Sequence, residues 1–376
     1  MLRNTFATID LNNVAHNVKA VRSVLAKNSQ VMAVVKDDAY GHGMLQVSRA
    51  ALNAGATWLA IAMPEEAEEL IQNGIGCPIL VLGKSNMAQK KLAVSLGLRQ
   101  CAADPQDIEE LAQAARELNK PAIAHLKVDT GMSRIGIRSH EEFMQAVRLL
   151  RANQNVQFEG IFTHFACSDE ADKSFTEQQD ALFREYIAIA RENGFAPLAH
   201  ASNSAGAIEL PSMHYDMIRL GISLYGYYPS GEVRRDSVDL RPVMQVETEI
   251  CSLREIEEHD TVGYGATFKA GKKTTVATLP IGYGDGYNRL LSGRGRVIVA
   301  AQGRAYYAPV IGRVCMDQIM IDVTGIPVKT GDRVVVMGSC MDKTVDADEI
   351  AGICGTISYE IVLGYSQRVP RIYLKE

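Results

Sequence analysis

The first part of the chain alternates short apolar segments with segments of helical periodicity. The apolar segments carry hydrophobic residues without a regular polar alternation, which is typical of parallel strands buried on both faces. Helical periodicity separates most of them, for example at residues 64–73, 105–118, 141–152 and 176–193. Eight strands alternating with helices predict an N-terminal (β/α)8 barrel of the TIM type, and a doubly wound open sheet is the alternative. The eight apolar segments are 31–35, 58–62, 78–82, 98–102, 122–128, 157–163, 197–201 and 216–223.

The pattern changes near residue 230. The stretch PSGEVRRDSVDLRP is polar and rich in turn-forming residues, which indicates a linker. Short β-type segments punctuated by Gly and Pro follow it, without long helices between them, and predict a mostly-β C-terminal domain. We therefore expect a barrel domain at residues 1–235 and a β domain at residues 236–376. The β-type segments are 244–253, 274–279, 296–301, 318–323 and 333–337.

Composition excludes several classes of protein. The net charge of −5 argues against a general nucleic-acid binder, which would present a basic field. No apolar run approaches the roughly 18 residues of a membrane span, and the start MLRNTFATIDLNN has no apolar core of a secretory signal. The seven cysteines are scattered without a CxxC pair, so we expect reduced thiols in a cytoplasmic protein, with no disulfide framework and no metal site.

The residues that follow the apolar segments are the candidates for chemistry, because barrel enzymes place their sites at the carboxyl ends of the strands. Lys36 ends the first segment and begins a loop containing glycines. Its amine is suited to a Schiff base if the site is desolvated; the alternative is a solvated lysine at a strand end. The stretch 202–206 and the turn at Gly221 offer hydroxyl and backbone N–H donors for a phosphate, or are simply turns.

Four further side chains lie at the same predicted edge. His164 is placed to stack on a planar ring or to serve as a structural histidine. Arg134 is suited to clamp a carboxylate or to form a surface ion pair. Arg219 stands inside the apolar run MIRLGI and needs a partner there. Lys127 shares one face of its strand with Asp129 by alternation, which is also the pattern of a simple Lys–Asp pair.

Four clusters stand out in the C-terminal half. Two of them, VGYGATF (262–268) and LPIGYGDGYNR (279–289), place tyrosines between glycines, which is also a common turn pattern. The other two are GRVCMDQ (312–318) and GTISYE (355–360).

Together these segments resemble the alanine racemase family, whose members are fold-type III pyridoxal-phosphate enzymes. The resemblance extends over nearly the whole chain, and the motifs follow in the family's order. They are AVVKDDAYGHG, HLKVDTGMSRIG, EGIFTHFACSDE, HASNSAG, MIRLGISLYG, VGYGATF, PIGYGDGYNR, GRVCMDQ and GTISYEI.

The resemblance implies a role for each matching residue. Lys36 would hold pyridoxal 5'-phosphate covalently and, with Tyr264, act as one of two catalytic bases. The cofactor would also be bound by His164 stacked on its ring, Arg219 at the pyridine nitrogen, and phosphate-binding residues. The phosphate set is Tyr40, Ser204, Gly221, Ile222 and Tyr359, with Asn203 adjacent. The substrate carboxylate would meet Arg134 and Met316, the entrance would be narrowed by Tyr283 and Tyr359, and Lys127 matches a position that is carbamylated in many members.

The resemblance also implies reaction and assembly. The activity would be interconversion of L-alanine and D-alanine, supplying D-alanine for peptidoglycan. The family is homodimeric with composite sites, so Tyr264 and Met316 would serve the partner's active site. A racemase for another small amino acid such as serine, a non-catalytic pyridoxal-phosphate-binding protein and a cofactor-free Schiff-base aldolase are the alternatives.

Two motifs depart from the common family pattern. The lysine motif often reads KANAYGHG and here reads KDDAYGHG, so Asp37 and Asp38 bring negative charge close to Lys36. The tyrosine motif often reads VSYGATY and here reads VGYGATF. Neither change alters a residue assigned to the chemistry, but both bear on rate and pH dependence.

Overall fold

A computed structural model describes residues 4–375 of the chain, which divide into two compact units. The barrel unit consists of Asn13–Ala39 and Met44–Arg241, and the β unit of residues 4–12, Tyr40–Gly43 and residues 242–375. The predicted boundary at 235/236 places residues 4–12 and Tyr40–Gly43 with the barrel. The structure groups residues 4–12 with the β unit, because the first strand pairs within its sheet. It groups Tyr40–Gly43 there as well, because the Tyr40 ring lies beside that of Tyr359 and Arg371 donates to Gly41 O.

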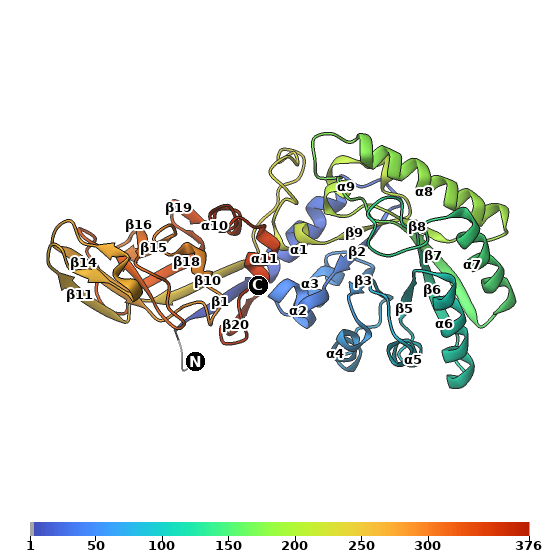
Figure 1. The fold of residues 1–376 in the computed structure, drawn as a ribbon, viewed down its shortest axis with the longest axis horizontal. Helices are drawn as coiled ribbons and strands as arrows, with labels where there is room; N and C mark the ends of the chain where they lie inside the picture. Colours follow the sequence, from blue (N-terminus) through green and yellow to red (C-terminus); the bar gives the residue numbers. More distant parts are fainter. Residues whose placement is uncertain (1–3, 376) are drawn as a thin grey trace. The chain divides into compact units, whose positions relative to one another are not determined.

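The barrel unit is built on eight parallel strands, as the sequence predicts (Figure 1). Each strand neighbours the next in sequence, and the ninth strand of the chain pairs with the second. Two backbone hydrogen bonds link the remaining edges: Asp216 N–H donates to Ala199 O at 3.1 Å, and Arg219 N–H donates to Ser202 O at 2.9 Å. The sheet is thus a nearly closed barrel rather than an open sheet. Its strands are β2 (Gln30–Val34), β3 (Trp58–Ile61), β4 (Ile79–Val81), β5 (Arg99–Ala102), β6 (Ala122–Lys127), β7 (Val156–Phe162), β8 (Leu198–His200) and β9 (Met217–Leu220).

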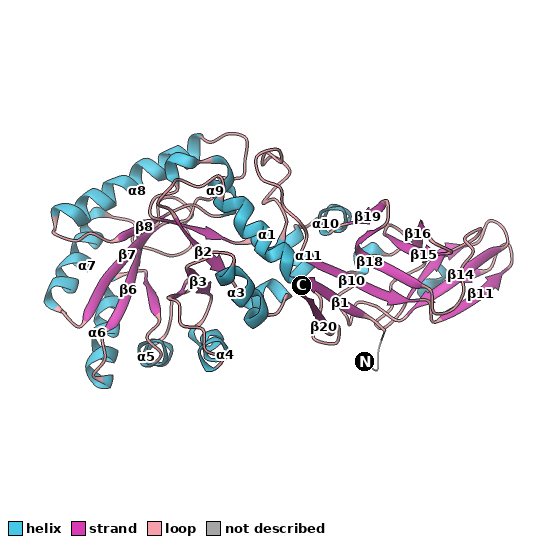
Figure 2. Ribbon diagram, turned by 180° about the vertical axis from the view of Figure 1, so that it is seen from behind, coloured by secondary structure: helices cyan, strands magenta, loops and turns pink. Residues whose placement is uncertain are grey.

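Helices follow the barrel strands and cover their outer faces (Figure 2). Local signals define their ends. In α6, Asp104 caps the first turn by accepting from Asp107 N–H, Pro105 stands at the first position, and Asn119 ends the helix in the left-handed region. The described helices of this unit are α1 (Leu11–Arg22), α3 (Met44–Asn53), α4 (Ala67–Gln72), α5 (Met87–Ser95), α6 (Pro105–Leu118), α7 (His140–Ala152), α8 (Ser174–Glu192) and α9 (Ser204–Glu209).

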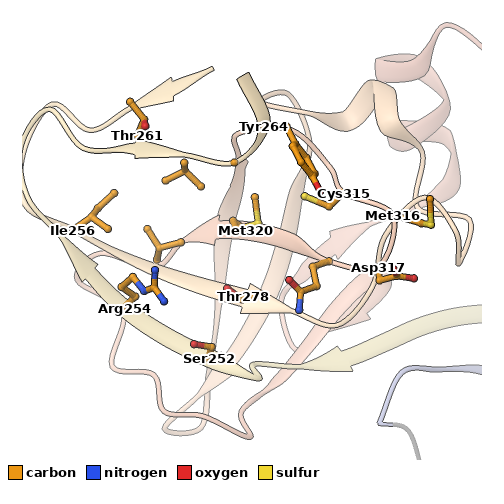
Figure 3. Close-up of a pocket in the computed structure, with 14 residues that line it drawn as sticks. Ser252, Arg254, Ile256, Thr261, Tyr264, Thr278, Cys315, Met316, Asp317 and Met320 are labelled. Atoms are coloured by element: carbon orange, nitrogen blue, oxygen red, sulfur yellow. The ribbon is translucent and has the colours of Figure 1, made fainter. Parts of the chain in front are cut away.

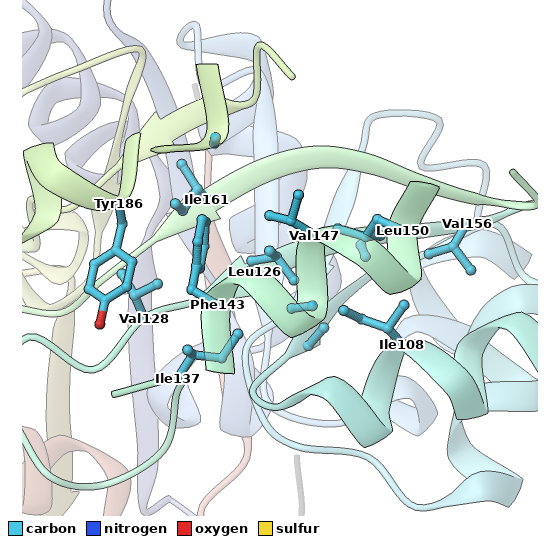
Figure 4. Close-up of a cluster of buried hydrophobic side chains, with 14 of the residues drawn as sticks. Ile108, Leu126, Val128, Ile137, Phe143, Val147, Leu150, Val156, Ile161 and Tyr186 are labelled. Carbon is cyan, nitrogen blue, oxygen red and sulfur yellow. The ribbon is translucent and has the colours of Figure 1, made fainter. Parts of the chain in front are cut away.

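The core of the barrel wall shows why these helices pack where they do. The helix α7 places Phe143, Val147 and Leu150 on one side, and all three are buried in one cluster with Leu126 of β6 and Ile161 of β7 (Figure 4). This spacing is the i, i+4, i+7 pattern of an amphipathic helix. No helix among residues 4–375 is long and apolar enough to cross a membrane.

The β unit contains a mixed sheet in which antiparallel pairs predominate. The first strand of the chain pairs antiparallel with β10 and parallel with β20, so the two ends of the chain share one sheet. The fold class, a (β/α)8 barrel with a mostly-β domain, is confirmed. Strands of this unit are β1 (Phe6–Asp10), β10 (Met244–Glu249), β11 (Ser252–Ile256), β12 (Thr261–Val262), β13 (Phe268–Lys269), β14 (Thr274–Leu279), β15 (Arg296–Ala301), β16 (Arg304–Ile311), β17 (Ile319–Asp322), β18 (Arg333–Cys340), β19 (Lys343–Val345) and β20 (Arg371–Leu374), with the helices α10 (Ala347–Cys354) and α11 (Ser358–Leu363).

Candidate active site

Lys36 stands two residues after the end of β2, at the carboxyl end of the barrel, and begins a short left-handed turn, α2 (Lys36–Gly41). Residues 37–40 all have φ between 52° and 54°, and Gly41 continues with φ 78°. A left-handed turn costs L-residues roughly 1–2 kcal/mol each. The surrounding structure must therefore hold this turn in place.

Two carboxylates hold the turn through backbone N–H groups. Asp38 accepts from Met44 N–H at 2.7 Å, the first residue of α3. Glu66 accepts from Asp37 N–H at 2.6 Å and also from the N–H groups of Ala62 and Met63. Glu66 therefore ties the loop after β3 to the loop that begins with Lys36. Sequence reasoning did not select Glu66, although a glutamate at the third position of a helical turn often accepts from the backbone N–H group of the residue before that turn, here Met63.

The two aspartates of the lysine motif, Asp37 and Asp38, make different contacts. Asp38 is engaged by the start of α3, as described above. The Asp37 carboxylate lies 3.6 Å from the Lys36 amine (Oδ2 to Nζ). Only one of the two added charges therefore faces the lysine.

Arg219 on β9 is buried, with 3% of its surface exposed. Its guanidinium donates to the carbonyl groups of Thr163, His200 and Ala201 and to ring nitrogens of His164 and His200, at 2.7–3.1 Å. Burial, with a smaller effect of the Arg134 charge, lowers its pKa to about 9. At neutral pH Arg219 is still protonated and acts only as a donor.

His164 follows β7 and accepts at Nδ1 from Arg219, at 3.1 Å. Burial, followed by the positive charge of Arg219, holds the pKa of His164 well below its usual range. The ring is therefore neutral, and with Nδ1 accepting, its proton is on Nε2.

Lys127 ends β6 with 4% of its surface exposed, and its amine lies 5.1 Å from the centre of the Phe162 ring. Burial first, and then the charges of Arg219 and Arg134, lower its pKa to about 7. Arg134 is exposed on the loop after β6. This loop is shaped by Asp129, which accepts from the N–H groups of Gly131 and Ser133.

The loops after β8 and β9 come together at Ser204. Its hydroxyl oxygen accepts from Gly221 N–H at 3.0 Å and from Ser223 N–H at 3.3 Å. Asn203 caps the helix that Ser204 begins, by accepting from Gly206 N–H at 3.1 Å. Ser204 and Ile222 each begin a helical turn. The first backbone N–H groups of such a turn have no carbonyl acceptor within the turn itself. This cradle offers N–H and O–H donors suited to an anion.

The β unit gathers three of the predicted residues on adjacent loops. Tyr283 N–H donates to Cys315 O at 3.0 Å, and Gly284 N–H donates to Met316 O at 2.8 Å, so the two loops run in contact. A Cβ on Gly282 would lie 2.3 Å from Cys315 O, which requires glycine there. Tyr264 and Met316 line one pocket together with Cys315 (Figure 3), and they are 71% and 54% exposed.

Tyr40 and Tyr359 form a second pair in the β unit. Their ring centres lie 6.1 Å apart. Gly41 follows Tyr40 with φ 78°, and a Cβ there would lie 3.2 Å from the carbonyl oxygen of Val362. The structure thus places the predicted residues in three groups. Lys36, Lys127, Arg134, His164, Asn203, Ser204, Arg219, Gly221 and Ile222 belong to the barrel unit; Tyr264, Tyr283 and Met316 form one group of the β unit, and Tyr40 and Tyr359 the other.

Fold and site together define a class of protein, an enzyme whose polar groups stand at the carboxyl ends of a (β/α)8 barrel. The chain belongs to the alanine racemase family: the family's N-terminal domain matches residues 9–229 and its C-terminal domain matches residues 243–373.

Known relatives match over nearly their full length. Alanine racemase 1 of Clostridium acetobutylicum is 42% identical over 376 residues, which cover all of this chain and 96% of the relative. The solved alanine racemase of the D-cycloserine-producing Streptomyces lavendulae is 34% identical, with a TM-score of 0.94 over 100% of this chain and 98% of that one. A histidine racemase of Leuconostoc mesenteroides is 28% identical, with a TM-score of 0.91 over 99% of this chain and 98% of that one.

The two aspartates of the lysine motif offer a matched test of the loop. Both have left-handed backbone, so Ala at either position incurs a similar conformational cost. Only Asp38 accepts from the start of α3, and we expect Asp38→Ala to lower the free energy of unfolding by about 1 kcal/mol more than Asp37→Ala. Urea unfolding of both variants measures the difference. Equal losses would contradict the capping role, and Asp38→Asn, which keeps an acceptor, serves as the control.

Proposed function

We propose that the chain interconverts L-alanine and D-alanine with pyridoxal 5'-phosphate held by Lys36. The observation that carries the proposal is the position of Lys36 at the same barrel edge as a buried Arg219, a neutral His164 and the Ser204 cradle. This donor set fits the cofactor: an amine for its aldehyde, a ring to stack on, a cation for its pyridine nitrogen and N–H and O–H donors for its phosphate.

The chain's own residues would then perform two proton transfers. The cofactor, when bound, supplies the electron withdrawal that acidifies the substrate's α-carbon. The Lys36 amine moves a proton on one face of that carbon, and the Tyr264 hydroxyl, from a second copy of the chain, moves a proton on the other. Arg134 and Met316 hold the substrate carboxylate, and Tyr283 and Tyr359 narrow the entrance. We also propose that the product D-alanine supplies peptidoglycan synthesis.

A racemase for another amino acid is the second candidate. The histidine racemase that shares this fold is one reason to keep it, because that protein is named for a larger substrate. A serine hydroxyl adds little volume to alanine, and a site discriminates weakly against such a small addition. We therefore expect some turnover of serine alongside alanine.

Chiral chromatography tests the proposal. Purified protein with pyridoxal phosphate should convert L-alanine to an equal mixture of isomers, and convert L-serine more slowly. We expect Lys36→Ala and Tyr264→Phe each to lose at least about 10²-fold in rate, as for removal of a general acid–base group. Tyr307→Phe, a change of an exposed tyrosine in the same unit, should retain the rate. Bound cofactor without conversion of alanine would overturn the assignment.

Composite sites make a separate prediction about assembly. If Tyr264 serves the partner's site, a dimer of one Lys36→Ala chain and one Tyr264→Phe chain has one intact site. Random reassortment makes half the dimers mixed, so mixing equal amounts of the two inactive variants should restore about a quarter of the wild-type rate. No recovery, although size-exclusion chromatography with two tags shows mixed dimers, would place Lys36 and Tyr264 of one chain in one site.

Lys127 is proposed to carry a carbamate that braces Arg134. A neutral amine adds to CO₂, giving N–COO⁻ and a proton, and a pKa of about 7 leaves much of the Lys127 amine neutral at neutral pH. The product's negative charge is favoured by the cations Arg219 and Arg134, which lower the pKa of the amine.

NMR with ¹³C-labelled CO₂ measures the modification. We expect a carbamate signal that decreases as the pH falls below about 7, because the protonated amine does not react with CO₂. The signal should be absent in Lys127→Ala, with a loss of rate of about 10²-fold from misplacement of Arg134. Lys84→Ala, at an exposed lysine, is the control. A signal that persists in Lys127→Ala would refute the assignment.

A further inference from the structure

A line of hydrogen bonds crosses the interior of the barrel from Arg219 to Glu159. The Arg219 guanidinium lies 3.0 Å from His200 Nδ1, His200 Nε2 lies 2.9 Å from His125 Nδ1, and His125 Nε2 lies 3.1 Å from Glu159 Oε2. The line joins four strands, β9, β8, β6 and β7. Interior positions of such barrels are usually filled by branched apolar side chains, so this polar line calls for a physical explanation.

The two ends of the line determine where the protons lie. Arginine can only donate, so His200 Nδ1 must accept, and the proton of a neutral His200 is on Nε2. That proton is donated to His125 Nδ1, which leaves the His125 proton on Nε2. An ionised glutamate can only accept, and Glu159 receives this last proton. Every bond therefore runs in one direction, away from Arg219.

Both histidines are neutral, as this pattern requires. Burial lowers the pKa of His125, and burial together with the Arg219 charge holds the pKa of His200 well below its usual range. A second proton on His200 would place an N–H group against the N–H groups of Arg219. The line is therefore satisfied by a single arrangement of protons.

The strands are shaped to make this line possible. Ala124 pairs with Phe158 and His125 pairs with Gly160, so Glu159 is the extra residue of a β-bulge. A bulge redirects a side chain that regular pairing would send elsewhere. A Cβ on Gly160 would lie 2.3 Å from His125 Nδ1, so glycine is required beside that ring.

Further side chains keep the ends of the line in place. Phe162 stacks on His200 with ring centres 4.9 Å apart and planes 6° apart. Arg99 donates to both Glu159 oxygens, from Nε at 3.0 Å and from its terminal nitrogen at 3.2 Å. Such a bidentate pair fixes the carboxylate plane. Trp58 packs edge-on against His125 at 5.6 Å, and the Arg99 guanidinium lies 5.4 Å from the Trp58 ring.

We propose that Glu159 is a positioning residue for Arg219, acting through His125 and His200. As an obligate acceptor at the far end, it stabilises, together with the obligate donor Arg219 at the near end, the tautomers in which His200 Nδ1 accepts from Arg219. This holds the guanidinium in one orientation, as a pure donor toward the ring nitrogen of the cofactor. The tautomer assignment stands on the barrel geometry alone, and its consequence for the cofactor rests on the proposed function.

Without Glu159 the proton on His125 Nε2 loses its acceptor. In Glu159→Met the carboxylate is gone, and Arg99, which donates to the same Glu159 oxygen as His125, remains as a second obligate donor. Donors at both ends then compete for acceptor nitrogens on the two histidines. We expect His125 and His200 to adopt mixed tautomers in this variant. Glu159→Gln keeps one acceptor oxygen and should restore the original tautomers.

Nitrogen NMR of protein labelled with ¹⁵N-histidine tests the proposal on the cofactor-free protein. The chain has eight histidines, and His125→Gln and His200→Gln assign the two signals. Wild type should show both rings neutral with the proton on Nε2. A proton on Nδ1 of either ring, or a doubly protonated ring, would overturn the proposal without any variant. So would wild-type tautomers in Glu159→Met.

A second experiment measures how the substitution changes cofactor absorbance and kcat in the enzyme with bound cofactor. In Glu159→Met we expect an altered absorbance maximum of the bound cofactor and a kcat about tenfold lower, with Glu159→Gln close to wild type. The matched control is Glu349→Met, which breaks a bidentate pair with Arg296 in the β unit. Unaltered absorbance and kcat in Glu159→Met would refute the positioning role. Failure of the proposed function would instead appear as wild type that binds no cofactor while the tautomers are as predicted.

Discussion

The barrel depends on a positive charge that is buried without a carboxylate among its described partners. Arg219 is bonded to three carbonyl oxygens and two imidazole nitrogens. A buried charge is tolerated only when its donors are satisfied, and these acceptors are the carboxyl ends of β7 and β8. Burial first, and then the Arg219 charge, lower the pKa of His164, His200 and Lys127. This charge therefore adds to burial in keeping the neighbouring side chains neutral, and it makes this end of the barrel attractive to anions.

The strands could be predicted from the sequence because buried parallel strands leave continuous apolar runs. Each of the eight predicted runs of the barrel overlaps one of its strands. The first strand of the chain, Phe6–Asp10, left no such signal, because it alternates buried and half-buried residues in a sheet completed by distant strands. The division into units therefore could not be predicted from local pattern alone.

Candidate side chains were predictable where a residue type contradicts its surroundings, as with Lys36 after an apolar strand or Arg219 within one. The partners of those side chains were not. Glu66 reaches the lysine loop from another strand end, and Glu159 owes its direction to a bulge in β7. Such contacts depend on register and tertiary packing, which no single segment encodes. The Asp37–Asp38 pair shows the same limit: the sequence shows two added charges near Lys36, and the structure engages one of them in holding α3.

The exposed side chains of Tyr264 and Met316 bear on the proposed assembly. They line one pocket of the β unit, and each is more than half exposed. Large apolar side chains grouped on a surface mark a site of interaction, and Tyr and Met are enriched where proteins meet. Tyr264 also lies between two glycines with positive φ, so the position of its side chain depends on a backbone conformation that favours glycine. A second copy of the chain that covers this surface would bury these side chains and bring the Tyr264 hydroxyl to a barrel that already holds the lysine. The same contact would thus both stabilise the proposed dimer and complete the proposed site.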